Sequence, residues 1–185
     1  LLSMVMAEAT NHYFKHLGVS DGLSQVCIPS IYQDELGAVW LGTTEGLNRY
    51  NGKDVKVFQP SESNHGLTNN EINELCGDKN GRMYIRSGND LIKLDIYTEQ
   101  FTCLRQKGVY GLFCKKDTLW VSCADGIYYY TGQGTELTFF ARVQKGFVGR
   151  ALYVDKETVW VVTRKYLVAI SREDPLRQEI LLTLD

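Results

Sequence analysis

The sequence predicts an all-β fold, a partial β-propeller of about four blades with four antiparallel strands each. The segment that begins at Gly22 recurs 44 residues later at Gly66, and two looser copies follow. In all four copies an aromatic residue is followed seven positions later by an aliphatic one, and helical periodicity is absent. These pairs are Trp40/Leu47, Tyr84/Leu91, Trp120/Ile127 and Trp160/Leu167. A period of about 40 to 45 residues with strand-like content is typical of blades that bury their faces by stacking.

The first copy contains four short segments with the composition of strands. They are residues 30–33, 39–42, 47–50 and 55–58. The turn between the first two contains Asp34, whose side chain can accept hydrogen bonds from its own turn, and Gly37, which can adopt positive φ. Asn51-Gly52 is a strong hairpin signal before the last segment. The first repeat is therefore expected to form one four-stranded sheet.

The later copies keep this scheme with altered turns. Asp78–Gly81 replaces the first turn in the second copy, and Lys115–Asp117 shortens it in the third. The fourth copy offers strands at 151–154, 159–161 and 167–170, with an outer strand near Ile180. The expected repeats cover about 22–65, 66–107, 108–146 and 147–185.

The first 21 residues lie ahead of the repeats. Residues 1–9 are apolar and end in Ala-x-Ala, which resembles the tail of a secretory signal; a frayed hydrophobic terminus is the alternative. Residues 13–17 match the outer strand of the first repeat and are predicted to be a strand of a closing blade. Because the fourth repeat has its own outer strand, we expect further blades after Asp185, so that residues 10–185 form an arc of a larger ring. Its unpaired edge favours a homo-oligomer.

Composition excludes several classes of function. A net charge of -2 and no run of Lys or Arg disfavour nucleic-acid binding, and no other segment approaches the ~20 apolar residues that cross a membrane. The five cysteines contain no C-x-x-C pair and no His at ligand spacing, which argues against a zinc site. Cys114 and Cys123 fall on neighbouring predicted strands, so a bridge is conceivable, but small buried thiols are the favoured interpretation.

No residue pattern predicts catalysis or a cofactor. The nearest carboxylate pair, Glu71 and Glu74, has no repeat context, and neither a nucleophile elbow nor a phosphate-binding loop occurs. Asp78–Gly81 resembles part of a calcium loop but lacks the remaining ligands, so we interpret it as a turn. We expect no catalytic, cofactor or metal site.

The repeated aromatic and aliphatic residues can be either ligand platforms or core. Their identical placement favours core between blades, where each aromatic side chain offers about 4 to 6 kcal/mol of burial energy as an upper estimate. The variable turns between second and third strands are the candidate binding face, with solvated loops as the alternative. The candidate binding residues are Thr44, Glu45, Asn89, Asp90, Asp125, Arg164 and Lys165.

Several segments together resemble the two-component regulator propeller repeat. They are residues 13–17, 21–25, 33–43 and 45–50, which include Gln33-Asp34, Gly37, Trp40-Leu41-Gly42-Thr43 and Glu45-Gly46-Leu47-Asn48-Arg49-Tyr50. The resemblance extends over residues 13–170 and weakens in the later copies, where Leu-Gly-Thr is replaced.

The resemblance implies a periplasmic sensor of a hybrid two-component system. Such proteins have two seven-bladed propellers, an immunoglobulin-like domain, a membrane helix, and kinase, receiver and DNA-binding modules. This chain would be the opening part of the first propeller, scaffolding oligosaccharide sensing and dimerisation, with the rest of its own propeller and the downstream sensor domains as partners. The alternatives are a propeller interaction scaffold and a propeller glycan lyase or hydrolase.

Overall fold

The computed structural model describes residues 15–60, 66–143 and 148–183, and in these ranges it is almost entirely β. Four antiparallel sheets each contain four strands in chain order. The first sheet consists of β1 (Ser30–Gln33), β2 (Val39–Thr43), β3 (Gly46–Tyr50) and β4 (Val55–Phe58). The second consists of β5 (Ile72–Gly77), β6 (Arg82–Ser87), β7 (Asp90–Asp95) and β8 (Gln100–Arg105). The third consists of β9 (Val109–Lys115), β10 (Thr118–Cys123), β11 (Gly126–Tyr130) and β12 (Thr138–Ala141). The fourth consists of β13 (Val148–Val154), β14 (Thr158–Thr163), β15 (Tyr166–Ser171) and β16 (Gln178–Thr183).

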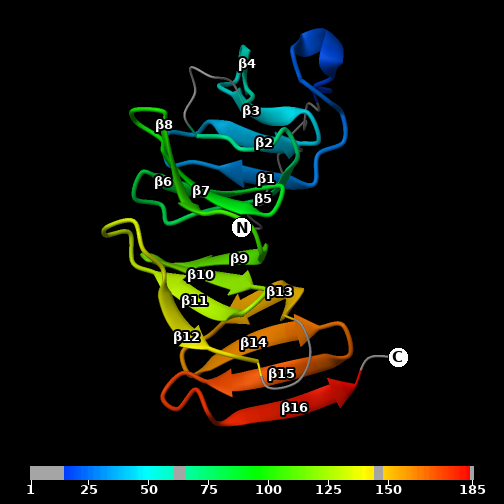
Figure 1. Cartoon of the computed structure of the whole chain (residues 1–185). Coiled ribbons are helices and arrows are strands. Elements are labelled where there is room, and N and C mark those ends of the chain that lie inside the picture. Colours follow the sequence, from blue (N-terminus) through cyan, green and yellow to red (C-terminus); the bar gives the residue numbers. More distant parts are fainter. Residues whose placement is uncertain (1–14, 61–65, 144–147, 184–185) are drawn as a thin grey trace, which may run out of the picture.

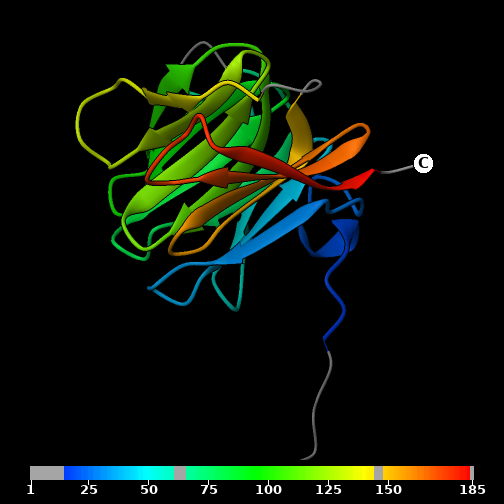
Figure 2. The same cartoon turned by 90° about the horizontal axis from the view of Figure 1, so that it is seen from below.

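The sheets follow one another along an open arc (Figure 1). The first strands of successive sheets contact each other, β1 against β5, β5 against β9 and β9 against β13, so these strands line the inner side of the arc. Seen from below, the strands of successive sheets run in different directions (Figure 2). This arrangement confirms the predicted partial propeller of four four-stranded blades, and the ring is not closed.

The hydrophobic core lies between the sheets. One cluster joins Trp40, Leu47 and Phe58 of the first sheet to Ile85 of the second, and Trp40 stacks on Phe58 with ring centroids 5.6 Å apart. A second cluster joins the second and third sheets, and a third joins the third and fourth. A blade by itself has an uncovered apolar face, so each sheet depends on its neighbour for burial.

Burial of the repeated aromatic and aliphatic positions depends on the sheet. Six of the eight are at most 5% exposed: Trp40, Leu47, Tyr84, Leu91, Trp120 and Ile127. Trp160 and Leu167, in the fourth sheet, are only half-buried. Their faces have no further sheet against them within the described residues, and Leu181 and Leu182 of β16 are exposed.

The turns form largely as predicted from the sequence. Asp34 accepts backbone hydrogen bonds within its turn, and Gly37 has φ 86°. Asn51 Oδ1 accepts the N–H groups of Lys53 and Asp54 before β4 begins. The short third-copy turn places Lys116 at φ 51° between β9 and β10.

Two expectations about the N-terminal segment meet the limits of the described residues. The signal-like residues 1–9 and residues 13–14 of the predicted closing strand lie outside these ranges. Residues 15–17 of that predicted strand are not in a strand, and a single 3₁₀ turn, η1 (Val19–Asp21), follows them. Each of the four described sheets consists of its own four strands, and none of them includes residues 15–17.

The structure does not form the Cys114–Cys123 disulfide that was conceivable from the sequence. Both residues lie on neighbouring strands, but the register places Cys114 opposite Leu119 and Cys123 opposite Val109. The two thiols therefore lie near opposite ends of the β9–β10 pair. All five cysteines are free thiols, and Cys123 is fully buried.

Candidate binding face

The turns that join the second and third strands of each sheet carry all of the predicted binding residues except Asp90, which is the first residue of β7. The segments that lead into the sheets lie beside these turns. Gly88 N–H donates to Glu71 O at 2.7 Å, and Ala124 N–H donates to Gly108 O at 2.8 Å. These segments and turns together form what we call the loop face.

Buried hydroxyls hold the loop face to the sheets. In the first sheet, Thr43 Oγ1 donates to Gly46 O at 2.8 Å and lies 2.9 Å from Ser24 Oγ. In the second, Ser87 Oγ donates to Asn69 O and accepts Asn69 N–H. Each hydroxyl lies three residues after the repeated aromatic, at a position that sequence reasoning did not single out. The recurrence of Thr, Ser and Thr there, with Cys123 in the third copy, was the available signal.

Asp125 belongs to a compact cluster of charged and aromatic side chains on the loop face. Arg105 Nη2 donates to Asp125 Oδ1 at 2.7 Å, and Tyr128 OH donates to Asp125 Oδ2 at 2.8 Å. The Arg105 guanidinium lies 4.6 Å from the Tyr128 ring centroid, and that ring meets Phe139 edge to face at 5.4 Å. Arg105 comes from β8 and the other three from the third sheet. We refer to these four residues as the Arg105 cluster.

The Arg105 cluster offers an ionised carboxylate, paired with Arg105, beside an accessible ring. Partial burial would raise the pKa of Asp125, but the hydrogen bonds from Arg105 and Tyr128 prevail and lower it below its ordinary value. Phe139 is 53% exposed. An exposed aromatic face next to oriented polar groups is suited to a polar ligand with an apolar face, such as a sugar ring.

The other predicted binding residues do not join this cluster. Asn89 is exposed, while Asp90 Oδ1 accepts Lys107 N–H at 2.6 Å. Thr44 and Glu45 lie on the first sheet, and Glu45 is exposed with its N–H donating to Thr43 Oγ1. Arg164 and Lys165 are exposed on the fourth sheet, and neither side chain has a partner among the described residues.

Glu74, one of the two carboxylates considered for catalysis, has structural partners. Glu74 Oε2 accepts Leu112 N–H at 3.1 Å and lies 3.4 Å from Arg86 Nε, so it links the second and third sheets. Burial raises the pKa of Glu74 and outweighs Arg86, which lowers it. Asp78, from the segment that resembles part of a calcium loop, accepts Asn80 N–H and pairs with Arg82, as expected of a turn residue. In the described ranges, no three potential metal ligands gather.

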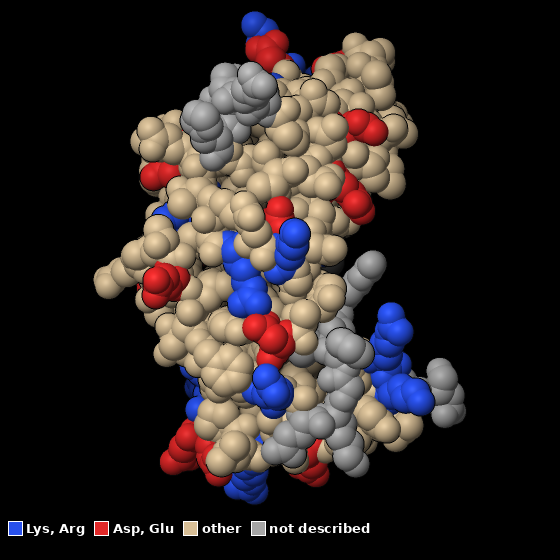
Figure 3. All heavy atoms as spheres, in the orientation of Figure 1, with Lys and Arg blue, Asp and Glu red and all other residues tan. Residues whose placement is uncertain are grey.

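Basic and acidic side chains are interspersed on the face seen in Figure 3, so this face has no patch of a single charge sign. A hollow of ≈ 540 Å³ at the open fourth sheet is likewise lined by both signs, including Lys156, Glu157, Arg172 and Glu179. No helix in the described part of the chain is long and apolar enough to cross a membrane.

Residues 22–45 match the two component regulator propeller family. The matched segment contains the Asp34 turn, Trp40 and the buried Thr43. Over 53 residues the chain is 40% identical to Histidine kinase P4 of Formosa agariphila, a stretch that covers 29% of this chain and 4% of that protein. The predicted resemblance to this repeat is therefore confirmed.

Solved structures share the fold. One is the extracellular domain of a protein described as a hybrid two component system, BT3049 of B. thetaiotaomicron, with 21% identity and a TM-score of 0.75 over 91% of this chain. Another is the extracellular domain of BT4673 of the same organism, described as a one component system, with 19% identity and a TM-score of 0.69 over 92% of this chain. The chain spans 26% and 27% of those two structures.

Proposed function

We propose that this chain is part of the periplasmic sensor of a two-component signalling protein, that it scaffolds oligosaccharide sensing and dimerisation, and that it carries no chemistry of its own. The observation that carries the proposal is the coincidence of a two component regulator propeller repeat at residues 22–45 with a fold shared by extracellular domains of such systems. The repeated sheets supply a constant scaffold, and the turns of the loop face vary on it.

The Arg105 cluster supports a carbohydrate ligand. Phe139 presents an exposed ring, and Asp125 keeps a hydrogen-bond acceptor oriented beside it. Sugar hydroxyls need such acceptors, and the apolar face of a pyranose can stack on an aromatic ring. The cluster spans two sheets, so a ligand bound there would also sense their relative position.

Calorimetric titration of the full chain with a panel of plant and microbial oligosaccharides tests this assignment. We expect one class to bind, and Phe139→Ala to weaken that binding by about 3- to 10-fold through loss of an aromatic contact. Leu176→Ala is the matched control, because Leu176 is 81% exposed in the loop between β15 and β16, away from the cluster. Equal effects of both variants, or no binding across the panel, would contradict a glycan site here.

The signalling role is tested by the coding sequence beyond residue 185. We expect a membrane helix and a histidine kinase in the same reading frame. A frame without kinase sequences would favour the interaction scaffold, and cleavage of a polysaccharide by the complete protein would favour a lyase or hydrolase. Sedimentation of the chain tests dimerisation, and a compact monomer at high concentration would contradict it.

A further inference from the structure

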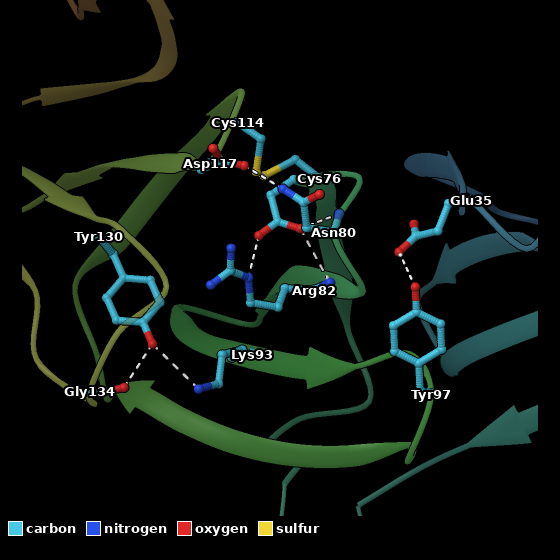
Figure 4. Close-up of polar contacts among 11 residues, drawn as sticks. Glu35, Cys76, Asn80, Arg82, Lys93, Tyr97, Cys114, Asp117, Tyr130 and Gly134 are labelled. Atoms are coloured by element: carbon cyan, nitrogen blue, oxygen red, sulfur yellow. Dashed lines mark hydrogen bonds and ion pairs between the residues drawn. The ribbon is translucent and has the colours of Figure 1, made fainter.

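Two cysteines meet at the interface between the second and third sheets. Cys76 lies on β5 and Cys114 on β9, the inner strands of their sheets, and their Sγ atoms are 2.6 Å apart (Figure 4). This separation is about 0.6 Å longer than the 2.03–2.05 Å of an S–S bond. Both cysteines are free, and both residues are half-buried.

Regular strands hold the two thiols in place. Cys76 is paired with Tyr84 of β6, and Cys114 with Leu119 of β10, so each backbone is fixed within its own sheet. Two further contacts cross the same interface, a hydrogen bond between the Asn80 and Asp117 side chains and the bond from Leu112 N–H to Glu74. The sulfur atoms therefore meet without any rearrangement of a loop.

The other three cysteines lack such a neighbour in the described ranges. Cys27 is exposed ahead of β1, and burial raises the pKa of the Cys103 thiol on β8. Burial also raises the pKa of the Cys123 thiol to about 12, although the charge of Arg105 acts to lower it. This high pKa leaves the Cys123 thiol unreactive. The 76/114 pair is thus distinguished from the rest by geometry.

We propose that Cys76 and Cys114 form an intrachain disulfide that joins the second and third sheets when the protein meets a small-molecule or protein disulfide as oxidant. The Cys114 thiolate attacks one sulfur of the oxidant, which releases the first thiol and leaves a mixed disulfide on Cys114. The Cys76 thiolate then attacks Cys114 Sγ and releases the second thiol. Two S–H bonds are lost, one S–S bond forms, two protons pass to the released thiolates, and the oxidant is reduced to two thiols.

The order of the two steps follows from the environments of the thiols. Burial and the neighbouring Cys114 sulfur raise the pKa of the Cys76 thiol, so Cys76 is a poor first nucleophile. Once the mixed disulfide has formed, the two sulfur atoms are already in contact, and proximity compensates for the small thiolate fraction. The product covalently fixes the contact between two blades that is otherwise only noncovalent.

The test uses the full chain, reduced and then incubated with oxidised glutathione. We expect the free thiol count to fall from five to three, with peptide mapping by mass spectrometry linking Cys76 to Cys114. The thermal midpoint should rise by about 5 to 10 °C relative to the reduced protein. Cys103→Ser is the matched control and should form the same bridge, whereas Cys114→Ser should lose it.

Mapping of the unaltered chain needs no variant, so the test holds even if Cys114→Ser fails to fold. The proposal is overturned if five free thiols persist after oxidation, if glutathione remains attached to Cys114 with no bridge, or if the bridge joins any other pair. A Cys76–Cys114 bridge without a rise in the midpoint would refute its role in joining the sheets.

Discussion

Replacing Asp34 by Ala should strongly destabilise the protein, because one buried carboxylate satisfies three donors. Asp34 is 4% exposed. Its Oδ1 accepts the N–H groups of Leu36 at 3.0 Å and Ala38 at 2.9 Å, and its Oδ2 accepts Trp40 Nε1 at 2.7 Å. Trp40 is fully buried at the interface with the second sheet, so its indole N–H has no water to replace the carboxylate.

The magnitude follows from these three bonds. Leaving the buried indole N–H of Trp40 without an acceptor costs about 1–3 kcal/mol. The Ala38 N–H is also buried and loses a bond to a charged acceptor, about 1.5–3 kcal/mol, while the exposed Leu36 can turn to water. We expect Asp34→Ala to lower the free energy of unfolding by about 3 to 5 kcal/mol, a large fraction of the ~5–15 kcal/mol typical of a domain.

The assay is urea unfolding followed by tryptophan fluorescence and circular dichroism. Asp155→Ala is the matched control, because Asp155 Oδ2 accepts Trp160 Nε1 at 2.8 Å and its Oδ1 accepts two turn N–H groups in the same pattern. Trp160 is only half-buried, so water can replace the lost acceptor and the loss should be smaller. A loss below 1 kcal/mol for Asp34→Ala, or an equal loss for Asp155→Ala, would refute the reasoning.

Three further predictions follow from burial, packing and protonation. Leu47→Ala should lower the free energy of unfolding by about 2–5 kcal/mol, because Leu47 is fully buried. The equivalent Leu167→Ala, in the half-covered fourth sheet, should lower it by less. Equal urea midpoints for the two variants would argue against burial between sheets. Gly66→Ala would place a Cβ 1.7 Å from Phe101 Cβ, so about 1–3 kcal/mol or more should be lost, and an unchanged thermal midpoint would show that this packing is looser. The hydrogen bonds from Trp160 and two backbone N–H groups lower the pKa of Asp155 from its ordinary value. The contribution of Asp155 to stability is therefore complete above the unfolded pKa and is lost as pH falls through the lower folded pKa. Asp155→Asn should therefore flatten the dependence of the thermal midpoint on pH below about 4, and an unaltered slope between pH 2 and 5 would count against it.

The candidate binding face was only partly predictable. Asp125 was identified because turns between second and third strands vary on a constant scaffold. Arg105 was not, because it lies on β8 and reaches Asp125 only through the contact between two sheets. Phe139 was not either, because it joins the cluster only through the β11–β12 pairing that sets its ring against Tyr128. The alternation along Tyr128–Tyr130 was predictable from strand geometry, and the structure places Tyr129 against Trp120 and Tyr130 against Tyr84.

The repeat in the sequence determined the number of sheets, their strands and the positions of their core residues, because strand alternation and turn chemistry act over a few residues and recur in every copy. The tertiary structure alone decided which equivalent positions are covered and which distant side chains meet. Trp40 and Trp160 occupy the same place in the repeat, yet only Trp40 is fully buried, because among the described residues only its sheet has a neighbour on that side. Cys114 likewise meets Cys76 rather than Cys123, because the packing of one sheet on the next is set by surfaces far apart in the chain.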